Sequence, residues 1–220
     1  MLAIELNNNI IPRLQLQDTV GKALQLIHDF KVSHLPVVAD EKYLGLISED
    51  DLLDAGNKKM IIQGLQEDFL DISIKENAHF LQAVNISNQF LTSVVPVVNE
   101  EKEFLGSISG QHLLKTLGNF SGALEIGGII VLEMERSQFT ISEISRIVES
   151  SEATILHLNT TVQPETGLLT VTIHINKKEL SMVVAAFERY EYDVIYYFGE
   201  EKFENEIHSN YRHLMNYLDI

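Results

Sequence analysis

An internal repeat is the sequence feature that most constrains the fold of this chain. Residues 33–38 read Ser-His-Leu-Pro-Val-Val, and residues 93–98 read Ser-Val-Val-Pro-Val-Val. Further along, the stretch Tyr43-Leu44-Gly45-Leu46-Ile47-Ser48 matches Phe104-Leu105-Gly106-Ser107-Ile108-Ser109, after one extra residue in the second copy. Because the two stretches keep their register over several elements, the sequence predicts two copies of one structural unit.

Each copy has the same predicted order of elements. In the first copy, apolar residues at helical spacing predict a helix over 18–30, and β-branched stretches predict strands over 35–38 and 44–47. Ser48 is placed to cap a following helix. The apolar face of the first helix consists of Val20, Ala23, Leu24, Ile27 and Phe30. In the second copy we expect a helix over 77–90, strands over 94–98 and 104–109 and a helix from 111, with a linking helix over 60–70.

The C-terminal part follows a different pattern. The predicted elements are a strand over 127–134, a helix over 140–150, strands over 154–162 and 168–175, a helix over 178–190 and a strand over 192–198. This βαββαβ order suits a ferredoxin-like sandwich. Thr140 is expected to cap the first of these helices, with Glu143 completing a capping box. Residues 201–220 predict an amphipathic helix that docks on a neighbouring surface.

Composition excludes several classes of function. The chain of 220 residues has no cysteine, which rules out disulfides, thiolate catalysis and cysteine-ligated metals. Its 32 acidic and 16 basic residues give a net charge of −16, which disfavours nucleic-acid binding. No apolar run approaches the ~20 residues that span a bilayer, and no signal peptide is visible, so we expect a cytoplasmic protein without a membrane contact. No catalytic motif occurs, so we expect no enzyme activity.

The repeat resembles a known module. Gly45-Leu46-Ile47-Ser48-Glu49-Asp50-Asp51, together with the preceding Pro36-Val37-Val38 and the second copy, resembles a tandem pair of CBS domains, or Bateman module. The βαββαβ unit resembles an ACT domain, and the combined order is similar to acetoin-utilisation-type CBS proteins. The resemblance implies an α+β chain with a first CBS repeat over 1–58, a second over 59–122, an ACT-like ferredoxin-like domain over 125–200 and a helical tail over 201–220.

The resemblance also implies a ligand site in the first copy. Ser48 and Asp51 stand three apart where a strand meets a helix, which places both side chains at the helix entrance. By resemblance, they contact the phosphate and ribose of an adenosine-containing ligand such as AMP or ATP. By the same resemblance, His34, Pro36 and Val37 face this cleft, with backbone atoms of the strand contacting adenine. The alternative for His34 is a surface or half-buried strand residue without a ligand. The alternative is that Ser48 is only a helix cap and Asp51 a solvated acid.

The second copy departs from this pattern. It keeps Ser109 but has His112 where the aspartate is expected. An imidazole cannot accept two ribose hydrogen bonds as a carboxylate does. Either the second site has degenerated into packing, or a cationic His112 lies near a phosphate.

These observations predict a non-catalytic regulatory module, a ligand sensor that requires no cofactor but binds an adenine nucleotide or another adenosyl ligand. We expect a homodimer, and a module that signals either through dimerisation or through a protein partner. A purely structural adaptor without a ligand is the alternative.

His157 and His174 are expected to be cross-strand neighbours, but two imidazoles alone predict no metal site. The turn over 135–139 lacks the glycine of amino-acid-binding ACT domains, so assembly is the expected role of that domain.

Overall fold

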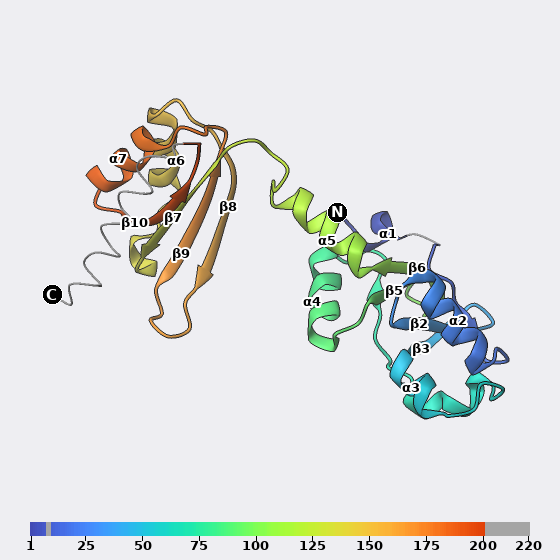
Figure 1. Ribbon diagram of the computed structural model, residues 1–220. Helices are drawn as coiled ribbons and strands as arrows, with labels where there is room; N and C mark the ends of the chain where they lie inside the picture. Colours follow the sequence, from blue (N-terminus) through green and yellow to red (C-terminus); the bar gives the residue numbers. More distant parts are fainter. Residues whose placement is uncertain (8–9, 201–220) are drawn as a thin grey trace. The chain divides into compact units, whose positions relative to one another are not determined.

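The computed structural model describes residues 1–7 and 10–200 (Figure 1). These residues divide into two compact units, with the boundary between Leu117 and Gly118. The first unit contains both copies of the repeat, and the second contains the βαββαβ region. The finer boundaries expected at residues 58 and 122 stay predictions. The predicted tail helix over 201–220 lies outside the described residues.

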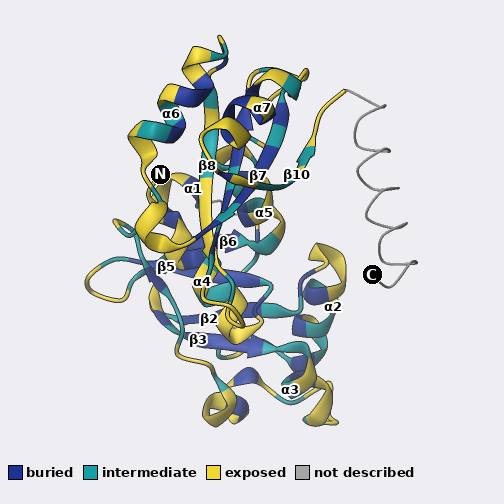
Figure 2. Cartoon of the chain, turned by 90° about the vertical axis from the view of Figure 1, so that its left-hand side faces the viewer, coloured by how far each residue is buried: buried dark blue, intermediate teal, exposed yellow. Residues whose placement is uncertain are grey.

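The two copies fold into matching βαββα units. In each, a parallel pair and an antiparallel pair of strands form a three-stranded sheet, ordered β1-β2-β3 and β4-β5-β6. The first copy comprises β1 (Leu14–Gln15), α2 (Val20–Phe30), β2 (His34–Ala39), β3 (Lys42–Ser48) and α3 (Glu49–Asp54). The second comprises β4 (Ile74–Lys75), α4 (Phe80–Phe90), β5 (Val94–Val98), β6 (Phe104–Ser109) and α5 (Gly110–Phe120). Figure 2 shows β2 and β3 as largely buried strands.

Two local expectations need correction. The linking helix expected over 60–70 is a 3₁₀ helix, η1 (Ile62–Asp68), in which Leu65 leaves the helical conformation. Phe30 was expected on the core face of its helix but is 39% exposed, because α2 ends there and Lys31 turns into the left-handed conformation. Val20, Ala23 and Ile27 are buried on the core face of α2 as expected, and Leu24 packs against the same core partly buried.

The segment that precedes each copy packs on the other copy. Residues 1–7, which contain α1 (Ala3–Leu6), bond to the second copy through the N–H of Ala3 and the carbonyl of Ala78, at 2.8 Å. Conversely, the N–H of Val20 in the first copy donates to the carbonyl of Met60, at 2.9 Å. Leu6 is accordingly buried in the core of the second copy, and Ile62 in the core of the first. This exchange interlocks the copies into one unit.

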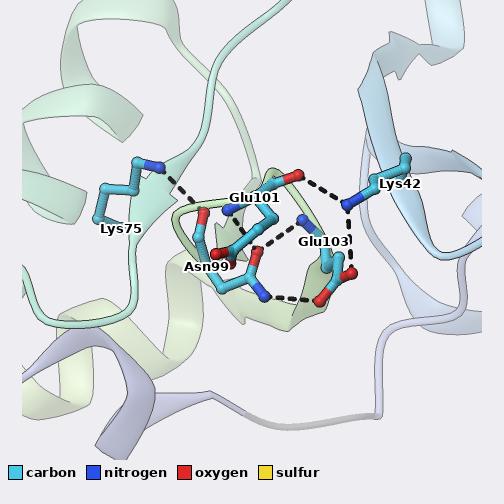
Figure 3. A network of polar contacts seen from close by, with 5 residues as sticks. All are labelled: Lys42, Lys75, Asn99, Glu101 and Glu103. Atoms are coloured by element: carbon cyan, nitrogen blue, oxygen red, sulfur yellow. Dashed lines mark hydrogen bonds and ion pairs between the residues drawn. The ribbon is translucent and has the colours of Figure 1, made fainter.

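The tips of the β2–β3 and β5–β6 hairpins also join the copies (Figure 3). The N–H of Tyr43 donates to the carbonyl of Lys102 at 2.9 Å, and the N–H of Phe104 donates to the carbonyl of Glu41 at 2.8 Å. Lys42 and Glu103 occupy equivalent positions in the repeat, yet they carry opposite charges and lie 3.1 Å apart. Hydrogen bonds from Asn99 and Lys42 hold the pKa of Glu103 below its ordinary value. Divergence of the copies thus places an ion pair where identical copies would place two like charges.

Ser107 marks a second divergence, because its equivalent in the first copy is the fully buried Leu46. The Ser107 hydroxyl is buried and has no hydrogen-bond partner among the described residues. Since an unpaired buried hydroxyl costs stability, Ser107→Ala is expected to be neutral or to stabilise the fold by up to about 1–2 kcal/mol. Urea unfolding measures this change.

Ser109→Ala is the matched control for that substitution. The Ser109 hydroxyl accepts the N–H of His112 at 3.2 Å at the start of α5, so its loss should destabilise by about 0.5–2 kcal/mol. A loss of more than about 1 kcal/mol in Ser107→Ala would show that its hydroxyl is satisfied after all.

The second unit is a four-stranded antiparallel sheet in the order β10-β7-β9-β8. Its elements are β7 (Gly128–Met134), η2 (Arg136–Gln138), α6 (Ile141–Ser150), β8 (Ile155–Val162), β9 (Leu169–Ile175), α7 (Ser181–Arg189) and β10 (Asp193–Phe198). Both α6 and α7 cover the same face of the sheet (Figure 1), and apolar residues from both helices and from β7 and β9 form its core. The predicted βαββαβ ferredoxin-like arrangement, and with it the α+β fold class, is confirmed.

The capping box expected at Thr140 was wrong. Thr140 precedes α6 but makes no side-chain hydrogen bond to it. Glu143 instead accepts the hydroxyl of Tyr192 at 2.9 Å. Burial and this carboxylate raise the pKa of Tyr192 to about 12. A long-range contact between α6 and the start of the last strand has therefore replaced the local cap.

Across residues 1–7 and 10–200, no helix combines the length and the apolar character that crossing a bilayer requires.

Candidate functional site

The predicted ligand residues Ser48 and Asp51 bind each other. The Asp51 Oδ2 atom accepts the N–H of Ser48 at 3.1 Å and its hydroxyl at 2.5 Å. In return, the Ser48 hydroxyl oxygen accepts the N–H of Asp51 at 3.1 Å. This reciprocal capping box fixes the Asp51 carboxylate at the start of α3 and leaves its Oδ1 atom to accept a ligand hydroxyl.

The strand register brings His34 to the same place, because His34 lies directly opposite Ser48 across the β2–β3 pair. Its Nδ1 atom accepts the N–H of Ser93 at 3.4 Å and lies 3.1 Å from the Ser33 hydroxyl. Burial lowers the pKa of His34, an effect that Asp51 and Asp50 oppose. An Nδ1 atom that accepts this N–H carries no proton of its own, so the contact favours the imidazole tautomer that is protonated on Nε2.

Pro36 and Val37 continue along β2 beside these residues. Both are buried, and the Val37 side chain belongs to the core of the first copy. A ligand beside β2 would therefore meet backbone atoms at Val37 rather than its side chain. Since backbone amides and carbonyls are neutral and directional, they suit the edge of a base.

The second copy lacks this arrangement. Val94 takes the position of His34 and lies opposite Ser109. It packs into the core of the first copy. Ser109 still caps its helix by accepting the N–H of His112, but no carboxylate stands at that position. Among the described residues, the predicted histidine, serine and aspartate therefore lie together in the first copy but not in the second.

Ser33 and Ser93 are contacts that the sequence reasoning missed. The Ser93 hydroxyl accepts the N–H of Ser33 at 2.9 Å and lies 3.4 Å from His34 Nδ1. The two serines occupy the same position in the two copies, and that identity was the available signal. Their hydrogen bond joins the two copies at His34.

The expected histidine pair of the second unit is confirmed as cross-strand neighbours, since His157 of β8 lies opposite His174 of β9. In the part of the chain that the structure describes, no three histidine, aspartate or glutamate side chains are arranged to hold a metal ion.

Comparison with known proteins agrees with the fold of the first copy. Residues 8–58, which contain the first copy of the repeat, match the family model of the CBS domain.

Three solved structures illustrate the likeness. A CBS domain pair/ACT domain protein from Thermotoga maritima is 19% identical with a TM-score of 0.49, over 55% of this chain and 98% of that one. CBSX2 in complex with AMP is 16% identical with a TM-score of 0.45, over 54% and 97%. The cytosolic domain of the Mg²⁺ channel MgtE in complex with ATP is 17% identical with a TM-score of 0.44, over 52% and 48%.

The depressed pKa of His34 makes a testable contribution to stability. Its pKa in the folded state lies below the ordinary value of 6.5, so as the pH falls through 6.5 the unfolded chain takes up the proton first. The stability that His34 contributes is therefore present above this pH and is lost on acidification. We expect His34→Asn, whose amide oxygen can accept the same N–H of Ser93, to lose less stability than the natural chain between about pH 7.5 and 5.5. If the unfolding free energies of His34→Asn and of the natural chain fall equally over this pH range, the expectation is contradicted.

Proposed function

We propose that this chain is a non-catalytic regulatory module whose first CBS copy binds an adenosine-containing ligand. The proposal rests on one observation. His34, Ser48 and Asp51 lie together at one strand-to-helix junction, within the residues that match the CBS family model. The Asp51 carboxylate accepts a ribose hydroxyl, and backbone atoms of β2 contact adenine. Ser109 and His112 do not form a second site of this kind.

The position of the site suggests how binding is transmitted. His34 belongs to the site and also accepts the N–H of Ser93 from the second copy. A ligand that contacts His34 therefore acts on the junction between the copies. If two arrangements of this junction differ in affinity, the ligand shifts their populations, and a partner of the module responds to that shift.

Thermal denaturation with adenosine, AMP, ATP and S-adenosylmethionine tests the proposal. A ligand at about 100 times its dissociation constant stabilises the folded state by about 2.7 kcal/mol. We expect at least one of these compounds to raise the melting temperature of the first unit. The absence of a shift with every one of them at millimolar concentration would refute ligand sensing.

One observation favours the alternative, a structural adaptor without a ligand. The capping box satisfies Ser48 and Asp51 with each other, so neither side chain needs a ligand to complete its hydrogen bonds. The same ligand screen separates the two functions, because an adaptor shows no shift.

We also propose that the chain forms a homodimer through helices of the first unit. Exposed apolar side chains recur at equivalent positions of both copies, since Leu53 and Leu114 are 57% and 71% exposed and Phe30 and Phe90 are 39% and 43% exposed. Exposed apolar side chains that recur in both copies suit closed two-fold association, which would cover them. Light scattering at micromolar concentration should give about twice the chain mass of 24.9 kDa. A monodisperse monomer would contradict the proposal.

A further inference from the structure

Two equivalent helices of the first unit, α3 and α5, differ in the charge that they present to solvent. We propose that the homodimer is antiparallel, with α3 of each chain packed against α5 of its partner. In a parallel dimer, each helix would instead meet the same helix of its partner. This inference rests on the proposed homodimer and names the orientation of its two chains.

The two helices have the same pattern of exposure. Leu52 and Leu113 are buried in the cores of their copies, at 1% and 4% exposure, so the residues that follow them point to the surface. Those residues are Leu53 and Asp54 in α3, and Leu114 and Lys115 in α5, and all four are exposed. Each helix therefore presents a leucine followed by a charged side chain at equivalent positions of the repeat.

The exposed leucines favour association but do not fix its orientation. In a two-fold interface, if one residue contacts a second residue of the partner, the second contacts the first in return. Leu53 can therefore be covered by the partner's Leu53 or by the partner's Leu114. Because the hydrophobic effect is non-directional, either arrangement removes the same kind of apolar surface from water.

The charges beside the leucines distinguish the two orientations. Asp54 and Lys115 occupy equivalent positions, and neither forms an ion pair among the described residues. A parallel dimer sets Asp54 against the partner's Asp54 and Lys115 against the partner's Lys115, which gives two repulsions. An antiparallel dimer sets each Asp54 against the partner's Lys115, which gives two attractions.

The other charges of these helix surfaces leave the choice to Asp54 and Lys115. Apart from histidine, α4 carries no charged residue and α5 carries only Lys115. In the first copy, Lys22 pairs with Asp18, and Asp51 is held by Ser48. The remaining charges there are of both signs and nearly balance. They are the acids Asp29, Glu49 and Asp50 on the helices and the lysines Lys31, Lys58 and Lys59 in the following loops.

Disulfide trapping in the full chain tests the orientation, because the natural chain has no cysteine. A disulfide needs Cβ atoms about 3.5–4.5 Å apart, so it reports which leucines face each other. We expect an equimolar mixture of Leu53→Cys and Leu114→Cys chains to form a covalent dimer on mild oxidation, seen by non-reducing electrophoresis. Each variant alone should form it at least about tenfold more slowly. Cross-linking of either single variant as fast as the mixture would show a parallel dimer and overturn the inference.

Charge reversal tests the orientation without altering the leucines. In the antiparallel dimer, Asp54→Lys faces the partner's Lys115, so we expect the dissociation constant of the dimer to rise about tenfold at low ionic strength. Adding Lys115→Asp should restore most of the affinity. In a parallel dimer, Asp54→Lys only exchanges one like-charge pair for another, and an unchanged dissociation constant would overturn the inference.

Glu101→Lys is the matched control, since it makes the same change in net charge at an exposed residue of the β5–β6 turn, away from the helices. Its effect on the dissociation constant should be smaller than that of Asp54→Lys, and equal effects would contradict a specific pairing. If light scattering shows a dimer but the mixture does not cross-link, the inference fails while the homodimer stands. If light scattering shows a monomer, the proposed homodimer itself fails.

Discussion

Replacing Asp51 with alanine is expected to weaken the binding of adenosine by about 1.5–3 kcal/mol, the range for hydrogen bonds to a charged group. This loss corresponds to roughly tenfold to more than a hundredfold in affinity. The physical reason is that Asp51 supplies the carboxylate held at the start of α3 by the capping box with Ser48. Calorimetric titration measures the change directly.

Two controls isolate the binding effect. His112→Ala alters the equivalent position of the second copy and should leave affinity nearly unchanged, so equal losses in the two variants would contradict the assignment of the site to the first copy. Asp51→Ala also removes the two hydrogen bonds that Asp51 accepts from Ser48 in the capping box, and urea unfolding measures the resulting loss of stability separately. Asp51→Asn retains an acceptor oxygen for the cap but lacks the charge, and we expect it to bind with intermediate affinity.

Truncation of Phe187 to alanine is expected to destabilise the second unit by about 3–5 kcal/mol. Phe187 is fully buried in the core beneath the four-stranded sheet and packs edge-on against Tyr192, with ring centroids 5.7 Å apart. The cores of the first unit share no residue with this cluster. Adenosine affinity should therefore be unchanged in this variant, as titration at a temperature where both units are folded can show.

The matched control is Phe198→Ala, the same substitution in the same unit at a side chain that is 60% exposed. Because little apolar surface is buried there, its cost should be within about 0.5 kcal/mol. A large loss of adenosine affinity in Phe187→Ala, with Phe198→Ala unaffected, would show that the two units are energetically coupled rather than independent.

The elements that sequence predicted best are those whose signals are local. The strands β5 and β6 have the predicted bounds, since β-branched residues and turn residues define both ends. The repeat predicted that the two copies share one arrangement of strands and helices. The spacing of Ser48 and Asp51 placed both at the helix entrance, and the capping box is a consequence of that spacing.

The features that sequence could not predict depend on long-range contacts. Nothing in residues 1–7 indicates that they pack on the second copy, because that contact depends on the course of the whole chain. Similarly, Glu143 was predicted to serve a local cap but bonds to Tyr192, which is 49 residues away. The contact of His34 with Ser93 depends on how the two copies pair, and their pairing follows from the interlocking segments.

Titration of the full chain with adenosine, repeated on Asp51→Ala, tests the central claim most directly. The account predicts saturable binding to the natural chain and an affinity loss of at least about tenfold in the variant. Binding that is unchanged in Asp51→Ala would place the ligand elsewhere. The absence of binding by the natural chain to adenosine, S-adenosylmethionine, AMP or ATP at millimolar concentration would contradict the account altogether.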